Sequence, residues 1–374
     1  MPRSLFFLAA PLAFVLADPA FSGSGEDPLD GSLAKGMITP AAQDAIDSGL
    51  AYLAGHQNSD GSFGTGQHRG NVAITSLCGL AFMAGGHQPD RGRYGKEVRR
   101  ALEFILSKED RAIPGFLNNS TVSRHGPMYG QGFGTLFLAE VQGMVYDPVL
   151  RERLRGTLNR AVKLIIDSQN SEGGWRYQPI KQDADISVTI CQIMALRAAR
   201  NAGITVPKSV ADRCIKYVQD CQDVRGSGGF RYQRQGGPLG FARTAAGVVA
   251  LYSAGVYEGE AVQKGLDYLM QNCRPGLNQP FPRDREMQIH YYYGHYYAAQ
   301  AMWTAGGRFW KEWFPAIRDE LLRTQASGGH RQADGSWFDR RISPFSPHYC
   351  PHYCTAMALI ILQIPNNYLP ILQR

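Results

Sequence analysis

The sequence lacks the features that mark an integral membrane protein, a nucleic-acid-binding protein or a disulfide-rich protein. After residue 17, no apolar stretch approaches the roughly twenty residues that a membrane-spanning helix needs. The formal net charge is +7, but no run of Lys and Arg is dense enough to predict nucleic acid as a partner. The seven cysteines are an odd number, so they define no disulfide framework.

The mild positive charge leaves three alternatives open. It is compatible with association with an anionic membrane surface, with binding of an acidic polymer, or with a basic but simply soluble surface. For the cysteines, closure of a pair such as Cys350 with Cys354 or Cys214 with Cys221 also stays open, since spacing alone cannot decide it.

The first 17 residues have the pattern of a secretory signal peptide. Arg3 precedes a short apolar run, and small residues follow near Ala17 and Ala20. We therefore expect cleavage near Ala17 and export to the periplasm or the extracellular space. Residues 18–36 are rich in Gly, Ser, Pro and Asp and are expected to form a flexible lead-in. Residues 37–374 are expected to form one domain.

The stretch 161–203 contains a pattern that recurs along the chain. An apolar run with helical spacing ends at Gln169, a Gly-Gly-Trp turn ends at Trp175, and a second helical run opens at Asp183 and Asp185. This unit is a helical hairpin, and its copies are roughly 50 to 60 residues apart. The second helices align at Thr75, Gln131, Thr189, Thr244, His295 and His352.

Six hairpins must either stack openly or close on themselves, because one hairpin cannot bury its own apolar face. An open stack needs polar caps at both ends. The last copy is instead apolar almost to the C-terminus, over residues 356–362. We therefore predict an all-α fold, an (α/α)6 toroid made of six hairpins.

The turns resemble the QW repeats of squalene-hopene and oxidosqualene cyclases and the related repeats of protein prenyltransferase β-subunits. The matching residues are Gln169 to Trp175, with sister turns at residues 60–63 and 334–337. The resemblance covers nearly the whole mature chain and implies a single-barrel, exported, bacterial-type member of this toroid superfamily. The repeat itself is a fastening, in which the Gln amide is expected to cap a helix start while its stem packs on the aromatic ring.

In such a toroid the second helices line the bore, and their first turns meet at one mouth. The resemblance places Asp183 and Asp185 where class II terpene cyclases carry an Asp-x-Asp-Asp motif, with Ile186 in place of the last Asp. It implies Asp185 as the acid that protonates an alkene or epoxide and Asp183 as its helper. The alternative is that one of them only caps the helix. The candidate ligand-binding residues at this mouth are Thr189, Gln131, Tyr291, His295, His348 and His352.

Three histidines are the candidates for a metal site. His348 and His352 are four residues apart, and His295 belongs to the adjoining hairpin, so three imidazoles could meet as zinc ligands. The Asp-x-Cys ligands of protein prenyltransferases have no counterpart, since residues 237–241 read Gly-Pro-Leu-Gly-Phe. We therefore expect no required cofactor, with zinc at these histidines as the alternative.

The sequence favours an exported toroid that handles an isoprenoid or similar apolar ligand in its bore, with proton-initiated terpene cyclisation as the candidate reaction. The aromatic stretch 291–297 fits this, because aromatic faces stabilise carbocations, but such faces also bind apolar rings without chemistry. The alternative is a non-catalytic toroid that binds a lipid, a peptide or a glycan. No Asp-Asp-x-x-Asp cluster for magnesium diphosphate is present, which disfavours protein prenylation.

Overall fold

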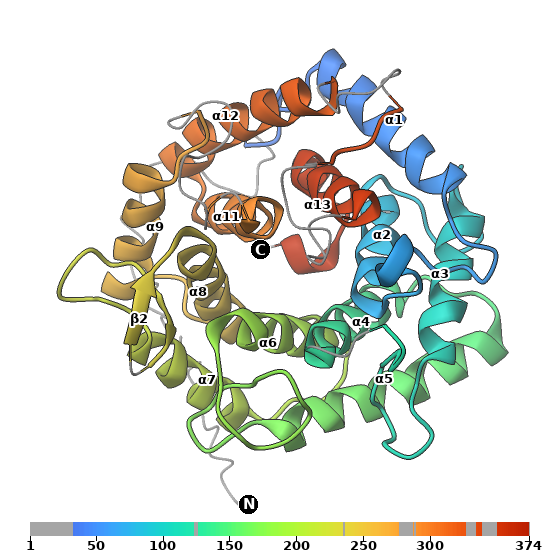
Figure 1. Cartoon of the computed structure of the whole chain (residues 1–374), viewed down its shortest axis with the longest axis horizontal. Coiled ribbons are helices and arrows are strands. Elements are labelled where there is room, and N and C mark those ends of the chain that lie inside the picture. Colours follow the sequence, from blue (N-terminus) through green and yellow to red (C-terminus); the bar gives the residue numbers. More distant parts are fainter. Residues whose placement is uncertain are drawn as a thin grey trace, which may run out of the picture.

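The computed structural model describes residues 33–122, 126–234, 236–276, 287, 289–326, 334–338 and 350–373. Twelve α-helices form two concentric rings in this part of the chain (Figure 1). The outer ring contains α1 (Pro40–Gly55), α3 (Gly95–Ser107), α5 (Pro148–Ser168), α7 (Lys208–Asp220), α9 (Glu260–Asn272) and α12 (Gly307–Ala326). The inner ring contains α2 (Val72–Ala84), α4 (Pro127–Val141), α6 (Ile186–Asn201), α8 (Phe241–Ala254), α11 (Tyr291–Ala305) and α13 (Pro351–Gln363).

The remaining described elements are short. An antiparallel pair, β1 (Arg231–Gln233) and β2 (Gly236–Leu239), precedes α8. Three 3₁₀ helices are present, η1 (Gly66–His68), η3 (Ile364–Asn366) and η4 (Pro370–Leu372). None of the described helices is both long and apolar enough to cross a bilayer.

The inner helices close into a complete ring. Each packs against the next along the chain, and α13 packs against α2, so the first and sixth hairpins touch. Outer helix α1 also contacts both α12 and α13. The predicted toroid of six hairpins is therefore confirmed.

Burial explains why the two rings differ in sequence. An outer helix such as α7 buries one stripe, which includes Val210, Cys214 and Val218, and exposes the rest. An inner helix such as α2 is buried on nearly every side, from Val72 to Ala84. A helix that is covered on one side needs an amphipathic sequence, whereas one that is covered all round needs an apolar sequence.

At four of the described turns, a Gln and a Gly join neighbouring hairpins. In the third hairpin, Gln169 Nε2 donates to Gly173 O in its own turn and to Val210 O in α7, both at 2.9 Å. Gln57, Gln222 and Gln325 bridge in the same way. The expectation that this Gln caps a helix start is wrong, because its amide nitrogen donates to carbonyl oxygens and links two hairpins instead.

Gly173 has to be a glycine. Its φ is +99°, which side chains rarely adopt, and a Cβ there would lie 2.2 Å from Arg213 O on the neighbouring outer helix. Gly61 faces Arg100 O in the same way, with 2.4 Å between the two atoms. The turn can approach the next hairpin this closely only without a side chain.

The C-terminal segment, residues 364–373, packs on the ends of inner helices opposite the mouth. The Trp303 indole donates to Leu372 O at 3.0 Å, and Ile371 N donates to Glu140 Oε2 at 3.1 Å. Burial raises the pKa of Glu140 to about 8. Near the other end of the chain, Leu33 is buried and accepts a hydrogen bond from the Trp310 indole at 2.8 Å. The described residues therefore include Leu33 to Gly36, which belong to the expected lead-in.

Candidate functional site

Asp185 is the N-cap of α6 and lies at the mouth of the toroid. Its Oδ1 accepts a hydrogen bond from Val188 N at 2.9 Å, and its backbone N donates to Trp175 O at 3.0 Å. The side chain is fully buried. The capping role that the sequence allowed is thus present, and it uses only one of the two carboxylate oxygens.

The second carboxylate oxygen of Asp185, Oδ2, lies in a buried environment that raises the pKa of this side chain. Among the described residues, Oδ2 has no hydrogen-bond partner at normal distance, and Arg176 Nε lies 3.7 Å away. Burial raises the pKa of Asp185 to about 6, while the Val188 amide, the Tyr232 hydroxyl and the Arg176 charge offset part of this effect. The carboxyl is therefore partly protonated near neutral pH.

Arg176 connects Asp185 to the surface. Its guanidinium forms an ion pair with Asp183 and lies over the rings of Tyr177 and Tyr232, at 5.0 and 5.8 Å from their centroids. The two tyrosine hydroxyls are 2.5 Å apart. Turns of the third and fourth hairpins thus meet beside Asp185.

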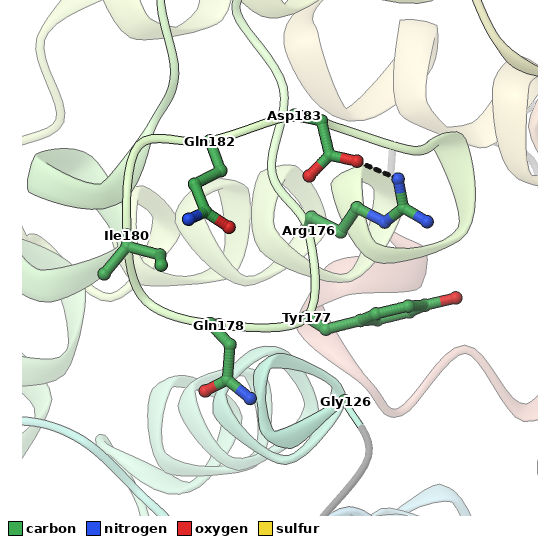
Figure 2. Close-up of a pocket in the computed structure, with 7 residues that line it drawn as sticks. All are labelled: Gly126, Arg176, Tyr177, Gln178, Ile180, Gln182 and Asp183. Carbon is green, nitrogen blue, oxygen red and sulfur yellow. Dashed lines mark hydrogen bonds and ion pairs between the residues drawn. The ribbon is translucent and has the colours of Figure 1, made fainter.

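A shallow pocket of about 240 Å³ opens beside this cluster (Figure 2). We call it the mouth pocket. It is lined by Gly126, Arg176, Tyr177, Gln178, Ile180, Gln182 and Asp183. Asp183 therefore lies at an accessible edge of the site and Asp185 at its buried edge.

Tyrosines cross the bore below Asp185. Tyr293 Oη donates to Ser187 O at 2.8 Å, and Tyr297 Oη lies 3.4 Å from Cys191 Sγ. Both tyrosines belong to α11 and reach α6, with α8 standing between these helices in the ring. Tyr296 adds an aromatic contact to Phe133, with ring centroids 6.2 Å apart. Aromatic side chains therefore fill part of the bore, where the sequence analysis predicts a bound ligand.

Thr189 and Gln131, two expected ligand contacts, are used by the scaffold. Thr189 Oγ1 accepts from Trp175 N at 3.1 Å, as Thr75 accepts from Phe63 N at 2.9 Å. Gln131 accepts from Leu117 N and donates to Gly115 O and to Ala161 O, so it links the second hairpin to α5 of the third. We assign both residues a structural role, because their buried polar groups already have backbone partners.

Tyr291 and His295 lie in the wall between α11 and α12. The Tyr291 hydroxyl donates to Glu320 Oε1 at 2.7 Å. The His295 ring packs 4.7 Å from that of Phe241 and 5.8 Å from that of Trp313, and its Nδ1 has no partner among the described residues. Burial lowers the pKa of His295 to about 3, so this imidazole is neutral.

His352 is hydrogen-bonded to the turn of the first hairpin. Its Nδ1 accepts from Gly64 N at 2.8 Å, and burial, with a smaller effect from His56, lowers its pKa to about 4. The alignment of the last copy at His352 is wrong, because Thr355 accepts from Trp337 N at 3.0 Å and so corresponds to Thr189. The error arises because the last turn is separated from its helix by a longer segment.

Two of the three imidazoles proposed to meet, those of His295 and His352, lie among the described residues. His295 and His352 share no contacting ring, and His348 lies outside the described residues. Within the ranges that the structure describes, no group of three or more His, Cys, Asp or Glu side chains could hold a metal ion.

Sequence reasoning missed Arg176, Tyr177 and Tyr232. A signal was present, since the same Arg-Tyr-Gln triplet follows the turn aromatic at Trp175 and again at Phe230. Equivalent tyrosines of adjacent hairpins are therefore the ones that pair. Gln178 is the last residue of the first triplet, whereas Gln182, which also lines the mouth pocket, had no such signal.

Structures with the same fold span several activities. No protein-family model matches the chain, and no curated protein matches it in sequence. The type II terpene cyclase MstE from Scytonema aligns with a TM-score of 0.56 and 15% identity, over 88% of this chain and 99% of that chain. The cellobiose 2-epimerase from Bacillus thermoamylovorans aligns with a TM-score of 0.60 and 12% identity, over 87% and 99%.

A third similar structure is the GH76A α-1,6-mannanase from Salegentibacter, with a TM-score of 0.56 and 8% identity, over 87% of this chain and 99% of that chain. Identities this low establish the shared fold and leave the chemistry open. The chain therefore has the α/α toroid fold that this cyclase, this epimerase and this mannanase share.

Proposed function

We propose that the protein is an acid-catalysing toroid enzyme in which Asp185 donates a proton to an isoprenoid bound at the mouth. The observation that carries this proposal is the buried Asp185 carboxyl, with one oxygen used as a cap and the other without a hydrogen bond of normal length among the described residues. A general acid works best when its pKa lies near the working pH, and burial raises the pKa of Asp185 to about 6.

The surroundings of Asp185 suit proton transfer to an alkene. Transfer of the Asp185 proton to an alkene carbon leaves a carbocation on the substrate and a carboxylate on the enzyme. The Arg176 guanidinium, 3.7 Å from Oδ2, would stabilise the carboxylate. Nearby tyrosine faces would stabilise the cation. Asp183 forms an ion pair with Arg176, and in this proposal it is the residue that assists Asp185.

The fold is also compatible with a second function. MstE is a terpene cyclase, but the mannanase and the epimerase act on glycans with the same architecture. A non-catalytic toroid that binds a lipid, a peptide or a glycan is therefore the alternative. Export, signal cleavage near Ala17 and contact with a membrane surface belong to the proposal as well, and N-terminal sequencing of the protein from its native compartment tests the first two.

Turnover of defined substrates tests the proposed function. The mature chain is incubated with squalene and with shorter polyprenes between pH 5 and pH 8, and products are detected by gas chromatography and mass spectrometry. We expect cyclised or isomerised product from the parent, and a loss of about 10²–10⁴-fold in Asp185→Asn. Absence of product from the parent across this range, with the polyprene still bound, would favour the non-catalytic alternative.

A further inference from the structure

We infer that the mouth pocket is a subsite for a neutral ring that carries several hydroxyl groups, such as a sugar. The inference deepens the proposed function, because the pocket adjoins Asp185 and names the class of head group that this acid would meet. It rests on the charge, the free polar groups and the size of the pocket.

The charges that line the pocket cancel. Arg176 and Asp183 form an ion pair with each other, so they contribute one positive and one negative charge at the same place. An anionic head group would have to compete with the Asp183 carboxylate for Arg176 or lie close to a like charge. A neutral polar ligand has no charge to compete with or to be repelled. It can accept a hydrogen bond from Arg176 and donate one to Asp183.

Two amide side chains are available for such a ligand. Gln178 and Gln182 are exposed, and neither side chain makes a hydrogen bond within the described part of the chain. Each amide offers donors and an acceptor, which is the combination that a hydroxyl group requires. Figure 2 shows Gln182 on the upper limb of the loop and Gln178 on the lower limb, pointing toward α4.

The loop that carries these amides is held by its backbone. Asn170 Nδ2 donates to Gln182 O at 2.8 Å, and Ile180 N donates to Gln178 O at 2.8 Å. Gln182 N donates to Ile180 O at 3.0 Å. A loop that is fixed in this way loses little freedom when a ligand binds, which favours recognition by its side chains.

Size and shape favour a single ring. A volume of about 240 Å³ is smaller than the roughly 300–1,000 Å³ typical of pockets for drug-sized ligands, so an oligosaccharide would extend out of it. Tyr177 is 36% exposed and Ile180 48% exposed, so the pocket also offers an aromatic and an aliphatic surface for the apolar face of a ring.

A hydroxylated ring could come from a free glycan or from the head group of an isoprenoid lipid. We test binding by saturation-transfer NMR with octyl β-glucoside below its micelle concentration, methyl β-glucoside and octyl phosphate. The variants are Gln178→Ala, Gln182→Ala and, as the control in the same loop, Lys181→Ala, whose side chain does not line the pocket.

We expect saturation of the sugar-ring protons of octyl glucoside in the parent and in Lys181→Ala. Each Gln variant should weaken binding about fivefold, as expected for one lost hydrogen bond. Tighter binding of octyl glucoside than of methyl glucoside would identify a lipid head group, and equal binding a free glycan; both support the subsite. Displacement of octyl glucoside by octyl phosphate at lower concentration, or unchanged binding in both Gln variants, would overturn it.

Asp185→Asn separates this inference from the proposed function. Asp185 does not line the mouth pocket, so sugar-ring saturation should persist in this variant while turnover is lost. Ring binding without turnover in the parent would contradict the proposed function alone. Turnover of a polyprene without ring binding would contradict the inference alone.

Discussion

The first and third hairpins hold their turns with the same residue types and differ at one helix cap. Gln57 and Gln169 bridge to the next outer helix in both. The inner helix is capped by Asn71 in the first hairpin, where Oδ1 accepts from Ile74 N at 3.1 Å, and by Asp185 in the third. Because Asn caps a helix about as well as Asp, capping alone explains neither the carboxylate nor its burial.

The residues after the turn aromatic sharpen this difference. Gly64 and Thr65 follow Phe63 in the first hairpin, whereas Arg176 and Tyr177 occupy the equivalent places in the third. Of these two hairpins, the third therefore surrounds its cap with a cation and phenols. The two hairpins therefore share their turn contacts and differ in the charged and aromatic residues around the cap.

The largest expected effect is on turnover. Asp185→Asn should reduce product formation by about 10²–10⁴-fold, because the amide keeps the cap and removes the acid. The mirror variant Asn71→Asp places a carboxyl at the equivalent cap and should leave turnover unchanged. A product assay of both proteins checks this, and equal losses in the two variants would break the comparison.

The shared scaffold is tested by the turn glycines. Gly173→Ala and Gly61→Ala should each lower the free energy of unfolding by about 2–4 kcal/mol, because a Cβ would overlap a backbone oxygen at 2.2 and 2.4 Å. Gly203 also has a positive φ, +80°, but nothing lies within 4 Å of its Cβ position, so Gly203→Ala should cost only about 1 kcal/mol. Urea denaturation measures all three, and similar losses throughout would contradict the close packing of the turns.

The pH dependence of stability tests the buried carboxyl. The folded-state pKa of Asp185 is raised from 3.8 to about 6, so the folded protein holds this proton more tightly than the unfolded chain. The parent should therefore lose stability as pH rises from 4 to 7, relative to Asp185→Asn, by about 2–3 kcal/mol. Denaturation at pH 4 and pH 7.5 measures this difference, and a gap between the two proteins that does not change with pH would argue against the shift.

The smallest expected effect is the loss of stability when Thr189 or Thr75, whose hydroxyls accept hydrogen bonds from turn amides, is replaced. Thr189→Val and Thr75→Val each leave one buried backbone amide without its acceptor, Trp175 N or Phe63 N, and should cost about 1–2 kcal/mol. Polyprene binding should persist in both. If Thr189→Val loses ligand binding while Thr75→Val does not, Thr189 contacts the ligand as its sequence position first suggested.

The fold was predictable because its fastening is local and repeated. Helical spacing and the Gln, Gly and aromatic turn recur in most hairpins, and each turn contacts only its neighbours. Two details were not predictable from the repeat, because in two hairpins other residues make the equivalent hydrogen bonds. Gln131 replaces both the Gln and the Thr of the other copies, and Thr355 is displaced from the register that His352 suggested.

The site was only partly predictable. Asp185 is a candidate because it lies at a helix start after a turn, where the resemblance to class II terpene cyclases implies an acidic motif. Its partner Tyr232 comes from the next hairpin, and spacing cannot show that the Tyr177 and Tyr232 hydroxyls meet. Helical spacing also cannot tell a polar residue that faces the bore from one that bonds to a turn, which is why Thr189 was grouped with the ligand contacts.

Direct titration of the Asp185 carboxyl tests its role as the acid. Carbon-13 NMR of protein labelled at the Asp carboxyl carbon is recorded for the parent and for Asp185→Asn, and the signal missing from the variant identifies Asp185. We expect a midpoint near pH 6, since burial raises the pKa of this group to about 6. A midpoint at or below 3.8, the ordinary value for Asp, would mean that Asp185 is ionised at neutral pH and acts only as a helix cap.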